Sequence, residues 1–137
     1  MNNPSADGAV KLILQIEGLC VLFLSILAYG KLGIGWKFFF LLFLVPDVSM
    51  IVYLLNSKRG HLIYNVAHSY SFPLLLLGTG IYFNAPAWLA TGLIWTAHIG
   101  FDRMLGYGLK YSSGFRFAHL GVIGRRGAAF RRRRGRP

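Results

Sequence analysis

The chain has 137 residues, of which 55% are hydrophobic and only 14% are charged. This composition excludes an ordinary soluble domain of this size and predicts a single-domain integral membrane protein. The formal net charge is +11, but ten of the fifteen Lys and Arg residues fall at or after Arg103, so the basicity belongs to a C-terminal tail. A cationic tail beside apolar segments favours anionic lipid headgroups as its partner and argues against nucleic acid.

Four apolar segments follow the N-terminal residues 1–11, and each is close to the twenty or so residues that cross a bilayer as a helix. In chain order they are 12–30, 36–55, 62–83 and 86–105. Short polar or turn-forming connections separate them, which makes neighbouring helices antiparallel. The sequence therefore predicts an all-α membrane protein in which residues 12–105 form a four-transmembrane-helix antiparallel bundle. Pro46 and Pro73 lie within their segments, where each removes a backbone hydrogen bond and can kink the helix.

The chain ends in two parts outside the predicted bundle. Residues 106–124 are predicted to be an interfacial segment, and residues 125–137 a disordered, Arg-rich tail. Under the positive-inside rule, this tail and the connection with Lys58 and Arg59 belong on the cytoplasmic side. We therefore expect a multi-pass membrane protein with both termini in the cytoplasm.

Three of the four acidic residues, Glu17, Asp47 and Asp102, lie within the predicted membrane segments. An ionisable side chain near hydrocarbon costs roughly 3 kcal/mol or more, so each acid indicates a functional site with a partner. His68 and His98 are the expected partners. At a rise of about 1.5 Å per residue, Glu17, Asp47 and both histidines lie roughly 7 to 12 Å below the cytoplasmic surface. These four residues come from the four different segments, so all four segments contribute to one polar layer. Asp102 follows His98 by four residues and therefore lies on the same helix face.

Carboxylates and imidazoles that face inward from bundle helices are ligands that suit zinc, iron or manganese. The predicted metal ligands are the acids and histidines of the last three segments: Asp47, His68, His98 and Asp102. A bound metal lowers the pKa of a coordinated water and supplies hydroxide for hydrolysis. Glu17 is then predicted to be a general base or a fifth ligand. Arg103 and Asn65 are predicted to orient an anionic group of the substrate.

Simpler interpretations of the same residues remain open at this stage. His98 and Asp102, four residues apart, can form a hydrogen bond that only holds helices together. Glu17 and Asp47 can pair with cations that reach in from the interface, such as Lys58. Neither alternative explains why polar residues of all four segments lie at one depth, which favours a shared site.

Three stretches carry a pattern of polar residues: VPDVSM at 45–50, YNVAHSY at 64–70 and WTAHIGFDRMLGYGLKY at 95–111. They resemble a bacterial family of small multi-span membrane proteins, the domain of unknown function DUF4260. The family's pattern falls here on an early glutamate, Pro-Asp, Asn-x-x-His, His-x-x-x-Asp-Arg and a late histidine: Glu17, Pro46, Asp47, Asn65, His68, His98, Asp102, Arg103 and His119. Ala118 replaces the family's threonine before His119 and leaves the imidazole available. The resemblance covers residues 10–124 and implies the inner membrane of a bacterium.

A shorter set of motifs, Pro-Asp, then His-Ser, then His-x-x-x-Asp, is similar to membrane-bound metal-dependent hydrolases of bacteria. We therefore expect a metal-dependent hydrolase of a lipid-like or phosphorylated substrate. Two alternatives stay open. The same groups can bind or transport an ion or protons, which would require a homo-oligomer because four spans are few for a transporter. The protein can also be a non-catalytic membrane interaction protein, whose polar groups only specify helix packing.

Overall fold

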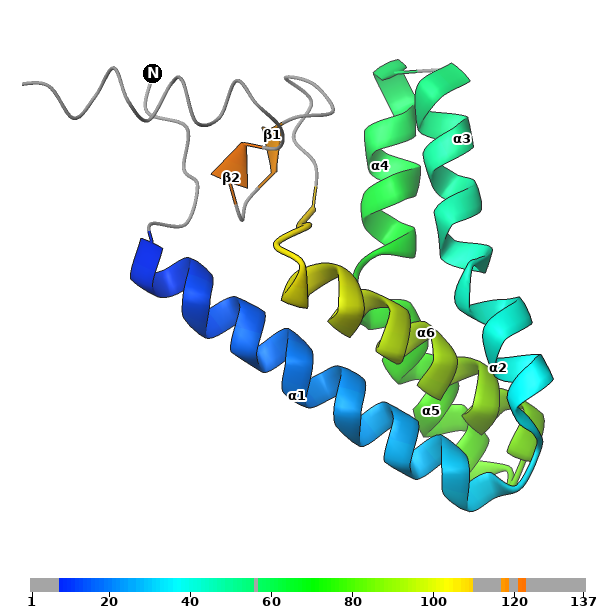
Figure 1. Ribbon diagram of the computed structural model, residues 1–137. Coiled ribbons are helices and arrows are strands. Elements are labelled where there is room, and N and C mark those ends of the chain that lie inside the picture. Colours follow the sequence, from blue (N-terminus) through cyan, green and yellow to red (C-terminus); the bar gives the residue numbers. More distant parts are fainter. Residues whose placement is uncertain (1–7, 56, 110–116, 119–120, 123–137) are drawn as a thin grey trace, which may run out of the picture.

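The computed structural model describes residues 8–55, 57–109, 117–118 and 121–122 (Figure 1). Its helices, in chain order, are α1 (Gly8–Leu32), α2 (Trp36–Phe43), the 3-10 helix η1 (Val45–Asp47), α3 (Val48–Leu55), α4 (Ser57–Ala67), α5 (Ser71–Tyr82) and α6 (Pro86–Met104). Two short antiparallel strands, β1 (Phe117–Ala118) and β2 (Gly121–Val122), pair Phe117 with Val122. The described residues are thus almost entirely helical, as predicted. The predicted tail at 125–137 and most of the interfacial segment lie outside them.

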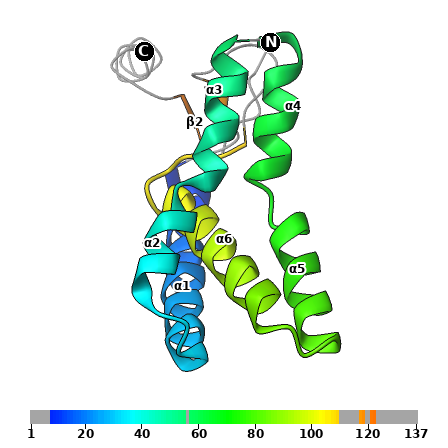
Figure 2. The ribbon, with the colours of Figure 1, turned by 90° about the vertical axis from the view of Figure 1, so that its right-hand side faces the viewer.

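Helices α1 and α6 lie side by side along most of their lengths (Figures 1 and 2). Their backbones come very close together at Gly18 and Gly100. A Cβ atom on Gly18 would lie 2.8 Å from the Gly100 carbonyl oxygen, and one on Gly100 would lie 2.8 Å from the Gly18 carbonyl oxygen. Only glycine permits such an approach of two helix backbones. Near the same contact, the side-chain amide of Gln15 donates to the Met104 carbonyl at 3.0 Å. The C-terminal half of α6 is therefore held firmly against α1.

The buried apolar core lies between α1, α2 and α6. Tyr29 and Phe39 pack edge to face with ring centroids 5.0 Å apart, against Ala90, Ile94 and Ala97 of α6. The Tyr29 hydroxyl donates to the Gly35 carbonyl at 2.7 Å, so this buried polar group is satisfied. Helix α5 packs on another side of α6. The core thus holds α6 in the middle of the packed helices.

The second and third predicted segments are each broken near their middle. Leu44 and η1 separate α2 from α3 at Pro46, and residues 68–70 separate α4 from α5. Pro73 lies in the first turn of α5, where its missing N–H costs little. Because of the two breaks, α3 and α4 form a hairpin that extends beyond α1, α5 and α6 (Figure 2). The predicted helices at 36–55 and 62–83 are therefore interrupted, the first at Pro46 as expected and the second just before α5 rather than at Pro73 itself.

The predicted connection with Lys58 and Arg59 is shorter than expected, because α4 already begins at Ser57 and includes both residues. Gly60 lies directly against the Tyr53 backbone and leaves no room for a Cβ atom. This contact lets α3 and α4 turn back on each other tightly. The hairpin therefore packs chiefly on itself.

Two helical stretches among the described residues are long and apolar enough to cross a membrane. They are Gly8–Leu32 and Trp36–Leu55, with mean hydropathies of 2.1 and 2.3. The molecule also exposes large apolar side chains over α1, α2 and α3, including Leu24 at 63%, Leu41 at 74% and Leu55 at 83%. Soluble monomers rarely leave such continuous apolar surfaces in water. The helices therefore suggest a membrane protein by their length and composition.

Candidate metal centre

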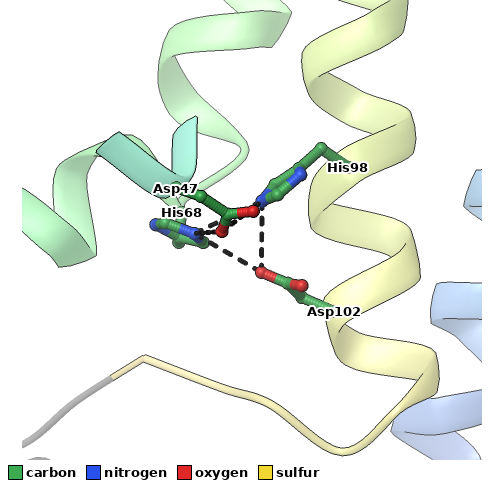
Figure 3. A group of neighbouring side chains, drawn as sticks. All are labelled: Asp47, His68, His98 and Asp102. Carbon is green, nitrogen blue, oxygen red and sulfur yellow. Dashed lines mark hydrogen bonds and ion pairs between the residues drawn. The ribbon is translucent and has the colours of Figure 1, made fainter. Parts of the chain in front are cut away.

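Four polar side chains converge where the two helix breaks meet α6 (Figure 3). Asp47 ends η1 at the first break, and His68 directly follows α4 at the second. His98 and Asp102 lie one turn apart on α6 and therefore share a face of that helix. Each break supplies one side chain and α6 supplies two.

The ligating atoms of these four residues all lie within 4.8 Å of one another. His98 Nε2 is 3.4 Å from Asp47 Oδ1, 3.3 Å from Asp102 Oδ2 and 3.4 Å from His68 Nε2. His68 Nε2 is 3.4 Å from Asp102 Oδ2 and 3.8 Å from Asp47 Oδ1. A tetrahedral metal with ligand bonds of about 2.0 to 2.2 Å separates its ligand atoms by about 3.3 to 3.6 Å. Four of the five separations fall in this range and the fifth is slightly longer, so the group could hold a single metal ion.

The His68 ring is oriented by the helix that precedes it. Its Nδ1 lies 3.0 Å from the carbonyl oxygen of Tyr64, one turn earlier. Because a carbonyl can only accept, Nδ1 carries the hydrogen and the Nε2 lone pair faces the cluster. The Tyr64 ring also stacks on the imidazole, with centroids 3.9 Å apart. A backbone carbonyl that holds the second ring nitrogen is the usual arrangement around a metal-binding histidine.

Both imidazoles are removed from solvent, with 4% of the His68 side chain and 2% of the His98 side chain exposed. The edge of the Phe43 ring packs on His98, with centroids 5.2 Å apart. The ring nitrogens of both histidines thus face carboxylate oxygens at a position that is largely buried. A proton bridges only two of these atoms at a time, whereas a metal ion attracts all four. The arrangement could therefore hold a cation at its centre.

The cluster has one open side and one small cavity. The Asp47 side chain is 43% exposed, whereas that of Asp102 is 17% exposed. A cavity of about 10 Å³ adjoins Asp102 and His68 and is also lined by Tyr64, Arg103 and Tyr107. That volume is about the space that one water molecule needs. A metal ion at the cluster would therefore have room for one water beside it.

Comparison with known proteins assigns the chain to a family. The model of the family described as "Domain of unknown function (DUF4260)" matches residues 11–123. The chain belongs to the DUF4260 family. The matched region contains all four residues of the cluster, and the family resemblance predicted from the sequence is confirmed. Neither the curated proteins nor the solved structures contain a match to the chain.

The remaining predicted site residues of this DUF4260 protein lie around the cluster or apart from it. Arg103 lines the small cavity, and its guanidinium carbon is 5.0 Å from the centre of the Tyr70 ring. Asn65 is partly buried on α4 but is not one of the four clustered residues. Glu17 is exposed on α1 and also lies outside the cluster. His119 lies outside the described residues. The predicted roles of these four residues stay predictions.

Tyr64 is a site residue that the sequence analysis did not single out. Its carbonyl and its ring both hold His68, and its side chain lines the cavity beside Asp102. The spacing of four residues between Tyr64 and His68 was the available signal, because residues four apart on a helix are neighbours. The aromatic residue one turn before His68 could therefore have been predicted to hold its imidazole in place.

Proposed function

We propose that this DUF4260 protein is an integral membrane protein that binds one divalent metal ion. The proposed ligands are the four clustered side chains: Asp47, His68, His98 and Asp102. One observation carries the proposal: each of the four residues offers one ligating atom, and these atoms all lie within 4.8 Å of one another. The four residues come from three separate parts of the chain: η1, the break after α4, and α6. Two imidazoles and two carboxylates suit zinc, iron or manganese.

We propose further that the chain crosses a bacterial inner membrane four times, through α1, through α2 to α3, through α4 and α5, and through α6. The exposed apolar surfaces support this, and so does the placing of the connections. The α1–α2 and α5–α6 connections lie at one end of the molecule and the α3–α4 connection at the opposite end (Figures 1 and 2). Lys58 and Arg59 begin α4, so the positive-inside rule puts that end and both termini in the cytoplasm.

The activity we propose is metal-dependent hydrolysis of a lipid-like or phosphorylated substrate. The water-sized cavity beside Asp102 and His68 supports it, because a water there would be next to the metal and acidified by it. Arg103 lines the same cavity and carries the charge that an anionic substrate group needs. Asp47, the most exposed ligand, marks the side from which a substrate would reach the metal.

Binding and transport of an ion is the second candidate. One observation favours it: Asp47 and His68 both lie at breaks in helices, and transporters build ion sites from discontinuous membrane helices. Four spans are few for a transporter, so this role requires a homo-oligomer. Flux of Mn²⁺ or Zn²⁺ into liposomes that is lost in Asp47→Asn would favour transport over hydrolysis.

Metal analysis of the detergent-purified protein tests the common part of both proposals. We expect about one zinc, iron or manganese ion per chain in the wild type, and none in the double variant His68→Ala/His98→Ala, because two of four ligands are lost. His61→Ala is the matched control, since His61 also lies on α4 but outside the cluster. A wild-type protein that takes up none of the three metals, even after incubation with each, would overturn the metal site.

A further inference from the structure

A second hollow lies on a different side of α4 from the metal cluster. It is an open groove of about 380 Å³, lined by apolar residues of three helices: Leu62, Ile63, Val66, Ala67, Phe72 and Trp95. The Trp95 indole N–H donates to the Ala67 carbonyl at 2.6 Å, and the Phe72 and Trp95 rings lie 4.8 Å apart. These contacts join α4, α5 and α6 at the groove. Its volume falls within the roughly 300 to 1,000 Å³ that small-molecule sites occupy.

One stripe of α4 residues runs from the groove to the cationic first turn of the helix. Arg59, Leu62, Ile63 and Val66 follow the spacing i, i+3, i+4 and i+7, so they form one stripe along α4. Arg59 and its neighbour Lys58 are both exposed in the first turn of the helix. At about 1.5 Å per residue, Arg59 and Val66 are separated by roughly 10 Å along the axis. The stripe is thus charged at one end and apolar over the rest.

The two cations lack an acidic partner among the residues that the structure describes. There, neither Lys58 nor Arg59 takes part in any of the ion pairs, which join His68 and His98 to Asp47 and Asp102. Helices α4 and α5 contain no acidic residue. A ligand for this surface therefore needs an anionic group next to a long apolar part.

We propose that this groove binds one anionic glycerophospholipid. An acyl chain lies along Leu62 and Val66 toward Phe72, and the phosphate contacts Arg59 and Lys58. Guanidinium binds phosphate oxygens in pairs, and basic residues near a membrane surface attract anionic lipids. The proposal rests on the membrane location proposed above but is independent of the metal and of any reaction.

Trp95 provides a direct reporter, because bromine atoms on acyl chains quench a tryptophan that they contact. The chain has three tryptophans, so the variant Trp36→Phe/Trp88→Phe leaves Trp95 as the single fluorophore. The full chain is reconstituted into vesicles that contain dibrominated phosphatidylglycerol or dibrominated phosphatidylcholine at equal mole fractions. We expect phosphatidylglycerol to bind at Trp95 more tightly, by roughly fivefold for each of the two cations.

Variants separate the groove from other cationic surfaces. Lys58→Gln/Arg59→Gln should abolish the preference but leave the quenching by phosphatidylcholine. The matched control Lys31→Gln/Lys37→Gln removes two exposed cations outside the groove and should keep the preference. Replacing Arg131, Arg132, Arg133 and Arg134 by Gln should also keep it. Val66→Phe, which fills the groove, should reduce quenching by both lipids.

The outcomes distinguish the lipid site from the membrane location. Equal quenching by the two lipids, or a preference that survives Lys58→Gln/Arg59→Gln, overturns the lipid site while the protein remains in the membrane. A preference lost when the four tail arginines are replaced also overturns it. If no tryptophan of the wild type is quenched by either lipid, the membrane location itself is wrong.

Discussion

The α1–α6 pair and the α3–α4 hairpin are packed in opposite ways. Helices α1 and α6 touch along most of their lengths, through backbones that meet at Gly18 and Gly100. Helices α3 and α4 contact each other much more than they contact the rest of the molecule, and Gly60 closes that contact. The cluster lies where these two regions meet. His98 and Asp102 belong to the firmly packed α6, whereas Asp47 and His68 stand at the base of the hairpin.

This difference gives the proposed metal a structural consequence. A metal ion that binds all four side chains would tie the hairpin to α6, where few other contacts do so. His98 and Asp102 are held in place by the packing of α6, and His68 is held by Tyr64, so we expect the exposed Asp47 to depend most on the metal for its position. The two regions should therefore respond differently to substitution.

The largest expected effect is on metal affinity. We expect His98→Ala to weaken metal binding by at least about 100-fold, because it removes a buried ligand. Changing a residue that only holds a ligand already costs metal affinity by about 10- to 100-fold. Asp47→Asn should weaken it less, by about tenfold, because Asp47 is the exposed ligand and its amide oxygen can still coordinate. Titration with a competing chelator measures both. Equal losses would mean that the α6 ligand is no better preorganised than the hairpin ligand.

The next effect concerns the close packing of α1 on α6. Gly18→Ala should lower the unfolding free energy by about 1 to 3 kcal/mol, because its Cβ meets the Gly100 carbonyl and the Arg103 side chain. Gly78→Ala is the matched control, since a Cβ on that α5 glycine meets nothing within 4 Å. Gly78→Ala should raise the unfolding free energy by about 0.5 to 1 kcal/mol, because alanine loses less backbone entropy in a helix than glycine. Thermal unfolding in detergent compares the two, and similar shifts would contradict the glycine contact.

A smaller effect is expected from the support of His68. Tyr64→Ala should reduce metal affinity by about tenfold, because the imidazole loses the ring that stacks on it. Tyr64→Phe keeps both the ring and the backbone carbonyl, so it should bind metal like the wild type. A loss in Tyr64→Phe as large as that in Tyr64→Ala would show that the hydroxyl, and not the stacking, supports the site.

The smallest expected effect of metal binding is on the distribution of distances between the α3–α4 hairpin and the α1–α6 pair. Spin labels at Leu54→Cys on α3 and Leu24→Cys on α1, in a Cys20→Ser background, report the hairpin against the packed helices. Adding metal should narrow that distance distribution, because the cluster then ties the hairpin to α6. A pair within the hairpin, Leu54→Cys with Leu62→Cys, should not change. Equal narrowing of both pairs would contradict a hairpin held mainly through the cluster.

Much of the site could be predicted because placing ionisable side chains in an apolar membrane segment costs free energy. Asp47, His68, His98 and Asp102 are polar groups in apolar segments. Counting helical rise placed the first three at a similar depth, and the four-residue spacing from His98 placed Asp102 on the same helix face. Depth, however, does not say around which side of a helix a residue lies relative to its neighbours. Glu17 has a comparable depth, yet it is exposed on α1 and lies outside the cluster.

Local sequence alone indicated the apolar segments, the kink at Pro46, the candidate ligands and the family, because hydropathy, proline chemistry and short motifs are properties of neighbouring residues. The break at residues 68–70 was less visible, since the nearest proline follows it within α5. Only the packed structure showed that Asp47 and His68, one at each break, both lie against His98 and Asp102 of α6. The physical reason is that Gly18 and Gly100, far apart in the chain, let the backbones of α1 and α6 meet, while the contact of Gly60 with Tyr53 closes the α3–α4 hairpin, and together these contacts select which helices touch.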